Sequence, residues 1–408
     1  LILGGGIHGV GIMHDFASRG WHDVHLLEKG HIGSGTSSRS TKLIHGGLRY
    51  LKNIRDFGLV AEALRERRTL MTLAGDLVKP IELIFPVLQK GGMPGWMIKA
   101  GLTLYDVLAG RYGMSKHAKL SIAEVEQRIQ GLDHSNFRGY YSFWDGQTDD
   151  LGLVKRVARS AQKLGVQYSE GCMATKVQRT DDGWLVKVKD SSGNDHNVSA
   201  LYVINCAGPW AHVLLENSQL QPTHRAINNK GSHLLFEDRG LKAGLFLQSP
   251  EDERIMFMLP WGGMTLVGTT EQLFEGSPDQ LTVTEKEVDY MLSRCNGYLK
   301  TPLAKADIKS TFAGLRWLAV DGSKSITSTS RSYVAGEHAG RRGLMVTLYG
   351  GKLTTYRTLA QAVGDRITKH FGEFKPSRTD DPGFWVGQMA NHSAEVPGVP
   401  ERFLAGQS

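Results

Sequence analysis

Cysteine is scarce in this sequence of 408 residues, which contains only Cys172, Cys206 and Cys295. The three are far apart, odd in number, and lie in no CxxC or Cys/His cluster. This argues against a disulfide framework and a structural zinc site, and it favours a reducing compartment. We therefore expect no metal centre.

Long apolar runs and long basic runs are missing as well. No uninterrupted apolar stretch approaches the roughly 18 residues that a membrane-spanning helix needs. No run of Lys and Arg with interleaved aromatic residues is present, so we expect no nucleic-acid partner. The 40% hydrophobic and 22% charged residues are ordinary for a globular protein, and the length suits two packed domains.

Glycine and positive charge are abundant. Many of the 49 glycines fall in pairs such as Gly46-Gly47 and Gly350-Gly351, which predicts close approach of the backbone to a large ligand. The net charge of +7 favours anionic partners such as phosphate substrates, a nucleotide or acidic lipid headgroups. Ordinary surface chemistry explains a surplus of this size equally well.

The hydrophobic periodicity predicts two architectures. Residues 1–28 read as strand, glycine turn, helix and strand, which is how a nucleotide-binding fold opens. Residues 232–270 alternate in short segments, which predicts an antiparallel sheet. Asp149 and Asp150 are placed to cap a helix. We expect further strands at 167–177, 184–189, 201–206 and 344–348, and helices at 54–75, 96–108, 151–164, 283–299 and 352–370.

We therefore expect two interleaved domains, because the nucleotide fold opens the chain, is interrupted and then closes it. The predicted nucleotide-binding domain comprises 1–75, 148–215 and 325–375, and the predicted substrate domain comprises 76–147 and 216–324. The tail at 376–408 is rich in Pro, Gly and Asp, and we interpret it as the start of a further domain. The short first strand leads us to expect missing residues before it.

A glycine fingerprint lies between the first strand and the first helix. Gly4, Gly6 and Gly9 form the pattern GxGxxG, and Glu28 ends the next strand. The glycines permit a tight turn and close approach of a pyrophosphate to the helix N-terminus, while Glu28 can accept hydrogen bonds from ribose hydroxyls. The combination predicts dinucleotide binding, and an acid without an adjacent arginine disfavours a 2′-phosphate.

Residues 33–50 distinguish FAD from NAD. The segment GSGTSSRSTKLIHGGLRY is dense in small hydroxyl residues and glycines, and such a loop can lie along the pyrophosphate and ring of a flavin. An NAD-binding chain would continue into a crossover helix at this point. A solvated linker is the alternative, but Leu43, Ile44 and the HGGLRY ending argue against it. The sequence predicts FAD.

The sequence resembles the FAD-dependent glycerol-3-phosphate dehydrogenases, within the flavoproteins of the D-amino-acid oxidase type. The resemblance spans nearly the whole chain and follows the family's order. It rests on GGGIHGVG at 4–11, TSSRSTKLIHGGLRYL at 36–51, NCAGPWA at 205–211, KGSH at 230–233, LPW at 259–261, GTTE at 268–271, AGLRWL at 313–318 and YGGKLTTYR at 349–357.

This resemblance implies an α/β fold, in which a Rossmann-like FAD-binding domain of the glutathione-reductase type is interleaved with an α+β substrate domain built on an antiparallel sheet. It implies oxidation of sn-glycerol 3-phosphate to dihydroxyacetone phosphate, with a quinone as the electron acceptor. The cofactor contacts that it implies fall on Gly4, Gly6, Gly9, Glu28, Thr36, Ser37, Lys42, Leu43, His45, Ala207, Gly208, Gly351, Lys352, Leu353 and Thr354.

The sequence departs from the family pattern at three positions. His8 stands where the family usually has Asn, and Glu271 replaces the Asp that follows GTT. Trp317 stands where the family usually has Pro, next to Arg316, a candidate substrate residue.

Gly350, Gly351 and Lys352 also have a physical rationale. We expect their backbone N–H groups to open the last helix, where a helix N-terminus beside a lysine stabilises the negative charge of a reduced flavin. A surface lysine at a helix start is the alternative interpretation.

A phosphorylated substrate needs a phosphate anchor. Arg49 and Arg316 suit this role because guanidinium groups bind phosphate bidentately. An ordinary ion pair is the alternative for each, and it is less plausible for Arg316 in its apolar AGLRWL setting. The resemblance also places Tyr50 and Lys352 at the substrate.

The reaction also needs a base for the C2 hydroxyl, and we favour His233, at the entry to a predicted strand. Its ordinary pKa of roughly 6.5 suits proton abstraction at neutral pH. A satisfied core histidine is an equally good interpretation, and His45 is the rival base. Thr269 and Thr270 could contact the substrate through their hydroxyls.

An apolar helix with basic neighbours Lys99, Arg111 and Lys116 predicts a patch that contacts a membrane surface. The patch would comprise Trp96, Met97, Ile98, Leu102, Leu104, Tyr105 and Leu108. Packing within the substrate domain explains this helix nearly as well. We expect a cytoplasmic protein, peripheral on the inner face of the cytoplasmic membrane, and a homo-oligomer is possible.

Two other functions remain open at this point. One is an FAD-dependent amine or amino-acid oxidase of the same fold, whose carboxylate substrate would need only one arginine. The other is a flavin-binding, membrane-associated protein without turnover.

Overall fold

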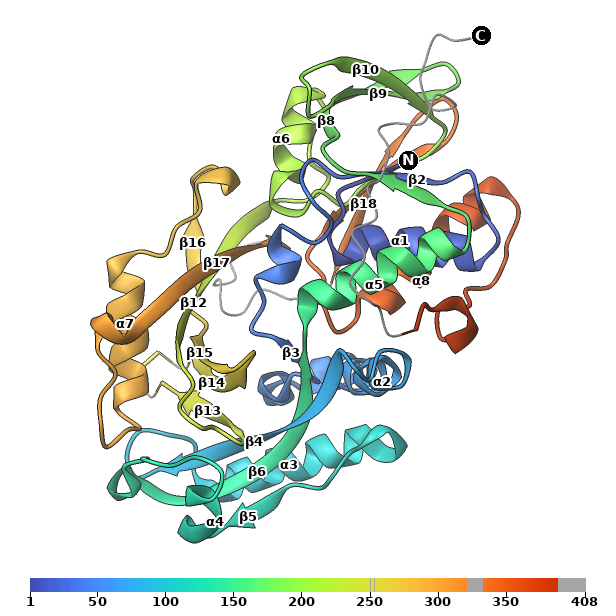
Figure 1. Ribbon diagram of the computed structural model, residues 1–408. Helices are drawn as coiled ribbons and strands as arrows, with labels where there is room; N and C mark the ends of the chain where they lie inside the picture. The colour runs from blue at the N-terminus through green and yellow to red at the C-terminus, as the bar shows by residue number, and fades with distance from the viewer. Residues whose placement is uncertain (250, 253, 321–332, 388–408) are drawn as a thin grey trace. The chain divides into compact units, whose positions relative to one another are not determined.

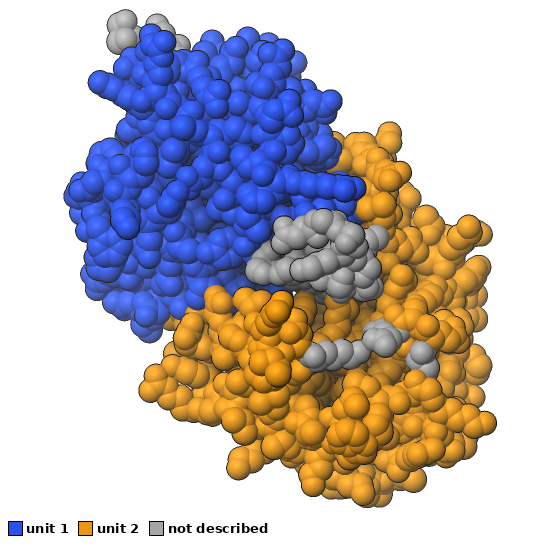
Figure 2. All heavy atoms as spheres, turned by 180° about the vertical axis from the view of Figure 1, so that it is seen from behind, with its two compact units in different colours: residues 1–38, 149–229, 315–408 blue, residues 39–148, 230–314 orange. Residues whose placement is uncertain are grey.

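The computed structural model describes residues 1–249, 251–252, 254–320 and 333–387. The chain divides into two compact units, which Figure 2 colours separately. Unit 1 comprises Leu1–Ser38, Asp149–Asn229 and Leu315–Ser408, and unit 2 comprises Arg39–Thr148 and Lys230–Gly314. One unit is built on a mainly parallel sheet and the other on a mainly antiparallel sheet, so the predicted α/β fold class is confirmed.

Unit 1 contains a six-stranded sheet whose five parallel strands are short and, except for Gln167, buried. Its five strands from β19 to β7 are parallel, and β18 adds an antiparallel edge. Uniform burial explains why β19 reads LMVTLY without polar alternation. In spatial order the strands are β18 (Val334–Ala339), β19 (Leu344–Tyr349), β11 (Val203–Asn205), β1 (Ile2–Leu3), β2 (His25–Leu27) and β7 (Gln167–Ser169).

Helices cover this sheet on one side, and a smaller sheet packs on the core at the other. Helix α1 packs against α5 and α8, as Figure 1 shows. Asp149 accepts a hydrogen bond from Gly152 N at 2.9 Å, so the predicted cap of α5 is confirmed. The elements are α1 (Ile7–Ser18), α5 (Asp150–Lys163), α6 (Ala211–Asn217), α8 (Tyr356–Phe371), β8 (Met173–Thr180), β9 (Gly183–Lys189) and β10 (Asp195–Ala200).

Unit 2 is organised around a large sheet in which β4 and β13 pair in parallel. The pairs β12–β15, β14–β15, β13–β14, β4–β6, β3–β6 and β5–β6 are antiparallel. The order of the sheet is β16-β12-β15-β14-β13-β4-β6-β3, with β17 also paired to β12 and β5 to β6. The strands are β3 (Leu43–Ile44), β4 (Val78–Leu88), β5 (Ala118–Leu120), β6 (Phe137–Thr148), β12 (Ala226–Glu237), β13 (Gly244–Gln248), β14 (Ile255–Trp261), β15 (Met264–Gly268), β16 (Gln272–Phe274) and β17 (Ile308–Ala319).

Two separate apolar clusters pack against this sheet. One includes residues of α2 (Phe57–Leu73) and α3 (Gly95–Ala109), and the other includes residues of α4 (Ile122–Glu126) and α7 (Glu285–Asn296). A capping box of Thr284 and Glu287 starts α7. The predicted helices at 54–75, 96–108 and 283–299 therefore exist. Helices α2 and α7 are shorter than predicted, and α3 extends one residue further at each end.

Several predicted boundaries differ from the structure. The helix predicted at 54–75 belongs to unit 2 rather than to the nucleotide-binding part, because α2 packs on the core of the antiparallel sheet. The strands at 173–200 form their own three-stranded sheet. The predicted boundary at 324/325 lies outside the described residues.

The tail predicted to begin a further domain packs on unit 1 as far as residue 387. Trp385 is buried, its ring lies edge-on to His14 at 5.3 Å, and its indole N–H donates to Thr379 O at 2.9 Å. His14 Nε2 also lies 2.8 Å from Phe384 O. Residues 388–408 of this tail lie outside the described part of the chain.

A buried polar network joins α2, α3 and β6 in unit 2. Arg67 donates to Asp145 at 2.6 Å and to Trp144 O at 2.9 Å. The Tyr105 hydroxyl donates to the same carboxylate at 2.8 Å and accepts from Gly46 N at 2.9 Å. The network therefore fixes the backbone of the HGGLRY segment at Gly46, and burial raises the pKa of Asp145.

Replacing Arg67 by Met should leave the Asp145 carboxylate buried without its cation. We expect the free energy of unfolding near neutral pH to fall by about 3–5 kcal/mol. Loss of the guanidinium raises the folded-state pKa of Asp145 further, so the loss should shrink as the pH falls through that pKa and the carboxyl becomes neutral. Urea unfolding at several pH values measures this loss of stability.

Arg68→Met, at an exposed position of the same helix, is the control and should change the free energy of unfolding by no more than about 0.5 kcal/mol. A loss in Arg67→Met that does not depend on pH would contradict the pairing of Arg67 with an ionised Asp145.

Candidate active site

The fingerprint turn in unit 1 accepts only glycine at two positions. Gly4 has φ +106°, and a Cβ built on it would lie 2.6 Å from Cys206 O. A Cβ on Gly9 would lie 1.9 Å from Gly4 O. The turn therefore packs backbone against backbone, which leaves the start of α1 open to a ligand that approaches closely.

The N-terminus of α1 offers backbone donors to an anion. Gly6 is its N-cap and has no side-chain cap, and its first turn contains no acidic residue among the described residues. Ile7 N donates to Ser37 Oγ at 2.9 Å, which fixes the segment of Thr36 and Ser37 beside the turn. Thr36 Oγ1 in turn donates to Leu315 O at 2.7 Å. An uncapped helix start is the usual seat of a pyrophosphate.

Glu28 directly follows β2 at the same edge of the sheet. Its carboxylate accepts hydrogen bonds from Gly5 N at 2.6 Å and from Gly30 N at 2.8 Å, one on each oxygen. A carboxylate has about four lone-pair sites, so it can still accept from two hydroxyls. Ala207 and Gly208 follow β11 at this edge, and Gly208 has φ +53°.

The turn of Gly350 and Gly351 lies against the start of α1. Gly350 N donates to Trp317 O at 2.7 Å, and a Cβ on Gly351 would lie 2.5 Å from His8 Cε1. Both glycines have positive φ, 74° and 94°. The prediction that these residues open the last helix is wrong, because α8 begins at Tyr356, so Lys352, Leu353 and Thr354 belong to the preceding turn.

His8 is a polar group that the sequence prediction left without a role. Burial lowers its pKa to about 4, so the imidazole is neutral at physiological pH. Its Nε2 atom is buried and has no hydrogen-bond partner among the described residues. The departure from Asn, noted in the sequence, is the signal that could have singled it out.

His233 lies on β12 in unit 2, opposite Gly268 of β15. It is 2% exposed, its Nε2 lies 3.0 Å from Thr41 Oγ1, and its ring stacks on Phe312 with centroids 4.7 Å apart. A Cβ on Gly268 would lie 2.3 Å from His233 Cδ2, so glycine there makes room for the imidazole. The ring is therefore held in one orientation.

A buried ion pair that sequence reasoning missed supports the strand that carries His233. Lys230 Nζ lies 2.6 Å from Glu287, and Ser232 Oγ donates to the same carboxylate at 2.7 Å. Thr270 also donates to Glu287, at 3.2 Å, and accepts from Ser232 N at 3.0 Å. Thr270 is thus engaged in holding the strands together, which uses the one proton that its hydroxyl could donate to a substrate.

Arg49 follows the glycine pair at 46–47, and its Nη1 lies 3.4 Å from Glu271 Oε1. Its guanidinium also lies 5.9 Å from the Tyr50 ring centroid. Lys42, predicted at the cofactor, is buried, and its ammonium lies over Trp261 at 4.7 Å.

Arg316 and Trp317 lie on opposite faces of β17, since side chains alternate along a strand. Trp317 is buried in the core of unit 1 and stacks on Tyr349 at 4.4 Å. The tryptophan that replaces the family's proline therefore supports the sheet, and Arg316 is the partly exposed member of this segment.

Within each unit the structure brings together a subset of the predicted residues. Unit 1 contains Arg316, Lys352, Gly4, Gly6, Gly9, Glu28, Thr36, Ser37, Ala207, Gly208, Gly351, Leu353 and Thr354. Unit 2 contains His233, Arg49, Tyr50, Thr269, Thr270, Lys42, Leu43 and His45.

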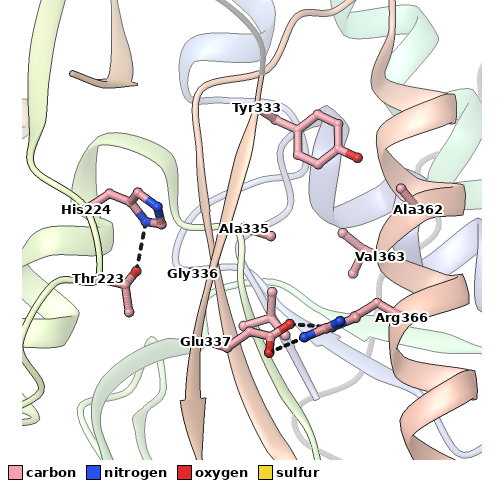
Figure 3. Close-up of a pocket in the computed structure, with 10 residues that line it drawn as sticks. Thr223, His224, Tyr333, Ala335, Gly336, Glu337, Ala362, Val363 and Arg366 are labelled. Carbon is pink, nitrogen blue, oxygen red and sulfur yellow. Dashed lines mark hydrogen bonds and ion pairs between the residues drawn. The ribbon is translucent and has the colours of Figure 1, made fainter. Parts of the chain in front are cut away.

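A pocket of about 550 Å³ in unit 1 contains none of these residues. Figure 3 shows it between the β18–β19 hairpin and α8, with the Glu337–Arg366 ion pair at 2.6 Å and Thr223 Oγ1 3.1 Å from His224 Nδ1. It is lined by Thr223, His224, Tyr333, Ala335, Gly336, Glu337, Val346, Ala362, Val363 and Arg366.

The chain belongs to the FAD dependent oxidoreductase family, whose model matches residues 1–357. It resembles the glycerol-3-phosphate dehydrogenases in particular, so the resemblance found in the sequence is confirmed, and its cofactor is FAD.

Two relatives illustrate the similarity. The D-erythritol 1-phosphate dehydrogenase of Brucella abortus is 32% identical over 398 residues, covering 97% of this chain and 78% of that protein. The glycerol-3-phosphate dehydrogenase of Pseudomonas tolaasii is 33% identical over 408 residues, covering 98% of this chain and 76% of that protein.

Solved structures share the fold. A glycerol-3-phosphate dehydrogenase from Bacillus halodurans, complexed with FAD, has a TM-score of 0.74 at 24% identity, covering 93% of this chain and 66% of that one. A glycine oxidase from Geobacillus kaustophilus has a TM-score of 0.65 at 19% identity, covering 92% of this chain and 95% of that one.

The residues present in unit 1 fit FAD. The uncapped start of α1 would hold the pyrophosphate, Glu28 would accept from the ribose hydroxyls, and the buried Nε2 of His8 offers a polar partner beside the Gly351 turn. The two positions where glycine is required, Gly4 and Gly9, let the backbone approach the phosphates.

Gly9→Ala tests this fit directly. The added Cβ would collide with Gly4 O, so the turn must open and lose its alignment with a pyrophosphate. We expect the dissociation constant for FAD, from fluorescence titration of apoprotein, to rise by at least about tenfold, or about 1.4 kcal/mol. Gly101→Ala in α3, where an added Cβ meets nothing within 4 Å, should bind FAD as the parent does. Equal FAD affinity in Gly9→Ala would contradict the assignment.

Proposed function

We propose that the protein oxidises sn-glycerol 3-phosphate to dihydroxyacetone phosphate and passes the electrons to a quinone. The observation that carries this proposal is the similarity over nearly the whole chain to several glycerol-3-phosphate dehydrogenases, at 31–34% identity. It is supported by one residue from each of three motifs: His233 of KGSH, Arg316 of AGLRWL and Lys352 of GGK. The choice of quinone rests on the family resemblance.

Arg316 is the phosphate anchor in this proposal. It is flanked by Leu315 and Trp317, which are both buried, so its guanidinium emerges from an apolar segment of β17. A phosphate dianion in a poorly solvated site needs charged donors, and a guanidinium supplies them in a fixed planar arrangement.

His233 is the base in this proposal. The ring is held by Phe312 and Thr41, and the imidazole of a histidine can accept the C2 hydroxyl proton as a general base. Proton removal raises the electron density at C2 and so eases departure of the C2 hydrogen with its electron pair. Bound FAD supplies the acceptor for those two electrons.

Lys352 contributes positive charge from the turn before α8. Because the helix begins only at Tyr356, this contribution comes from the ammonium group and from the N–H groups of the Gly350–Gly351 turn. An ammonium placed there would favour the anionic form of a reduced cofactor.

Two variants should separate the roles of anchor and base. Arg316→Ala should raise KM for sn-glycerol 3-phosphate roughly 10- to 100-fold, because a charged hydrogen-bond donor to phosphate is lost. His233→Ala should lower the rate of flavin reduction by roughly 10²- to 10⁴-fold, with KM nearly unchanged. Anaerobic stopped-flow reduction measures both.

Lys309→Ala, at an exposed position of the same strand as Arg316, is the control and should leave both quantities at the parent value. Parent-like flavin reduction in His233→Ala, together with slow reduction in His45→Ala, would transfer the role of base to His45.

Attachment to a membrane surface is also part of the proposal. None of the helices in the described ranges is long and apolar enough to cross a membrane. The predicted patch on α3 is smaller than expected, because Ile98, Leu102 and Tyr105 pack into the core of unit 2. Of the predicted residues, Trp96, which is 70% exposed, Met97 and Lys99 remain on the surface of α3. Val107, which the prediction did not include, is also exposed on this helix. An aromatic and apolar surface with basic neighbours suits an anionic headgroup layer.

Flotation with vesicles tests the membrane contact. The parent should float with vesicles that contain anionic lipid at low salt, and Trp96→Ser/Val107→Ser should remain at the bottom of the gradient. Phe374→Ser, which removes an apolar side chain that is 62% exposed on unit 1, is the matched control and should float like the parent. A parent protein that never floats would rule out this surface as a membrane contact.

A further inference from the structure

The ion pair of Arg49 and Glu271 bears on how the substrate is recognised. Only 6% of the Glu271 side chain is exposed, whereas 23% of the Arg49 side chain is exposed. The carboxylate is therefore largely withdrawn from water, and part of the arginine side chain remains accessible. Much of the positive charge of Arg49 is already matched within unit 2.

The pair lies a short way along the chain from the proposed base. Gly268 is directly opposite His233 in the β12–β15 register. Glu271 follows Gly268 by three residues, a separation of at most about 11 Å along the backbone. This is compatible with a small polyol phosphate whose C2 hydroxyl lies at His233 and whose other end reaches the pair.

The chemistry of the pair suits a hydroxyl better than a phosphate. A guanidinium only donates hydrogen bonds, and an ionised carboxylate only accepts them. A hydroxyl can accept from the first and donate to the second at the same time. Phosphate oxygens only accept and carry negative charge, so a phosphate beside Arg49 would be repelled by Glu271.

We propose that Arg49 and Glu271 together recognise the terminal hydroxyl of a polyol phosphate. The inference rests on the proposed function and reassigns Arg49 from the phosphate to the hydroxyl end of the substrate. The substrate class is then a polyol phosphate with a free terminal hydroxyl, and Glu271 is a specificity-determining residue.

The first test compares sn-glycerol 3-phosphate with propane-1,2-diol 1-phosphate of the same C2 configuration, which lacks the terminal hydroxyl. With the parent holoenzyme, the second-order rate constant for flavin reduction should favour sn-glycerol 3-phosphate by at least about 100-fold, because the analogue leaves the buried pair without a partner.

Glu271→Ala should reduce this preference below about tenfold. Glu271→Gln keeps the side-chain size and should also lower the preference for sn-glycerol 3-phosphate. This variant provides the test if Glu271→Ala does not fold. Glu275→Ala, at an exposed position shortly after Glu271 in the chain, should keep the parent preference.

The second test uses inorganic phosphate as a competitive inhibitor. Its inhibition constant should rise at least about tenfold in Arg316→Ala and stay within about twofold of the parent in Glu271→Gln. Clearly tighter phosphate binding in Glu271→Gln would show that Arg49 binds phosphate, which overturns the inference. Equal rates for the two substrates in the parent would overturn the inference alone, and reduction of the flavin by neither would overturn the proposed function as well.

Discussion

The backbone contact at the start of the chain is the constraint on which the cofactor site depends. Gly9 approaches Gly4 O so closely that no side chain fits, and Gly4 abuts Cys206 in the same way. These contacts hold β1, α1 and β11 together, so that the start of α1, Glu28 and Gly208 lie at one edge of one sheet. A helix N-terminus without an acidic cap then offers its N–H groups to a phosphate, and the other cofactor residues of unit 1 follow from that arrangement.

Buried charge plays the corresponding role in unit 2. Three ion pairs, Arg67–Asp145, Lys230–Glu287 and Arg49–Glu271, each fix a segment that carries a predicted site residue. Charges withdrawn from water persist only when paired and hydrogen-bonded, so each pair restricts its segment to one arrangement. The Arg67–Asp145 pair fixes Gly46, and the Lys230–Glu287 pair supports the strand of His233. The Arg49–Glu271 pair combines a hydrogen-bond donor and an acceptor at the segment that follows β15.

Local patterns were predictable from the sequence, and partners distant in the chain were not. The glycine fingerprint, Glu28 and the helices α2, α3, α5 and α7 follow from periodicity and capping within a few residues. The long strands β4 and β6 were missed, because β4 contains Pro80 and Pro86 and because β6 owes its regularity to eleven paired positions with β4. Gly350 and Gly351, with positive φ, delay the start of α8 beyond the predicted residue. Lys230 and Glu287 are 57 residues apart, so no local pattern in the sequence could pair them.

We propose that this protein oxidises a phosphorylated polyol. Anaerobic titration of the FAD-loaded protein with sn-glycerol 3-phosphate, with product analysis, tests it most directly. We predict that the visible absorbance of the flavin bleaches in proportion to the substrate added and that dihydroxyacetone phosphate forms in equal amount. Flavin that stays oxidised with sn-glycerol 3-phosphate and other polyol phosphates but bleaches with an amine or amino acid would contradict it.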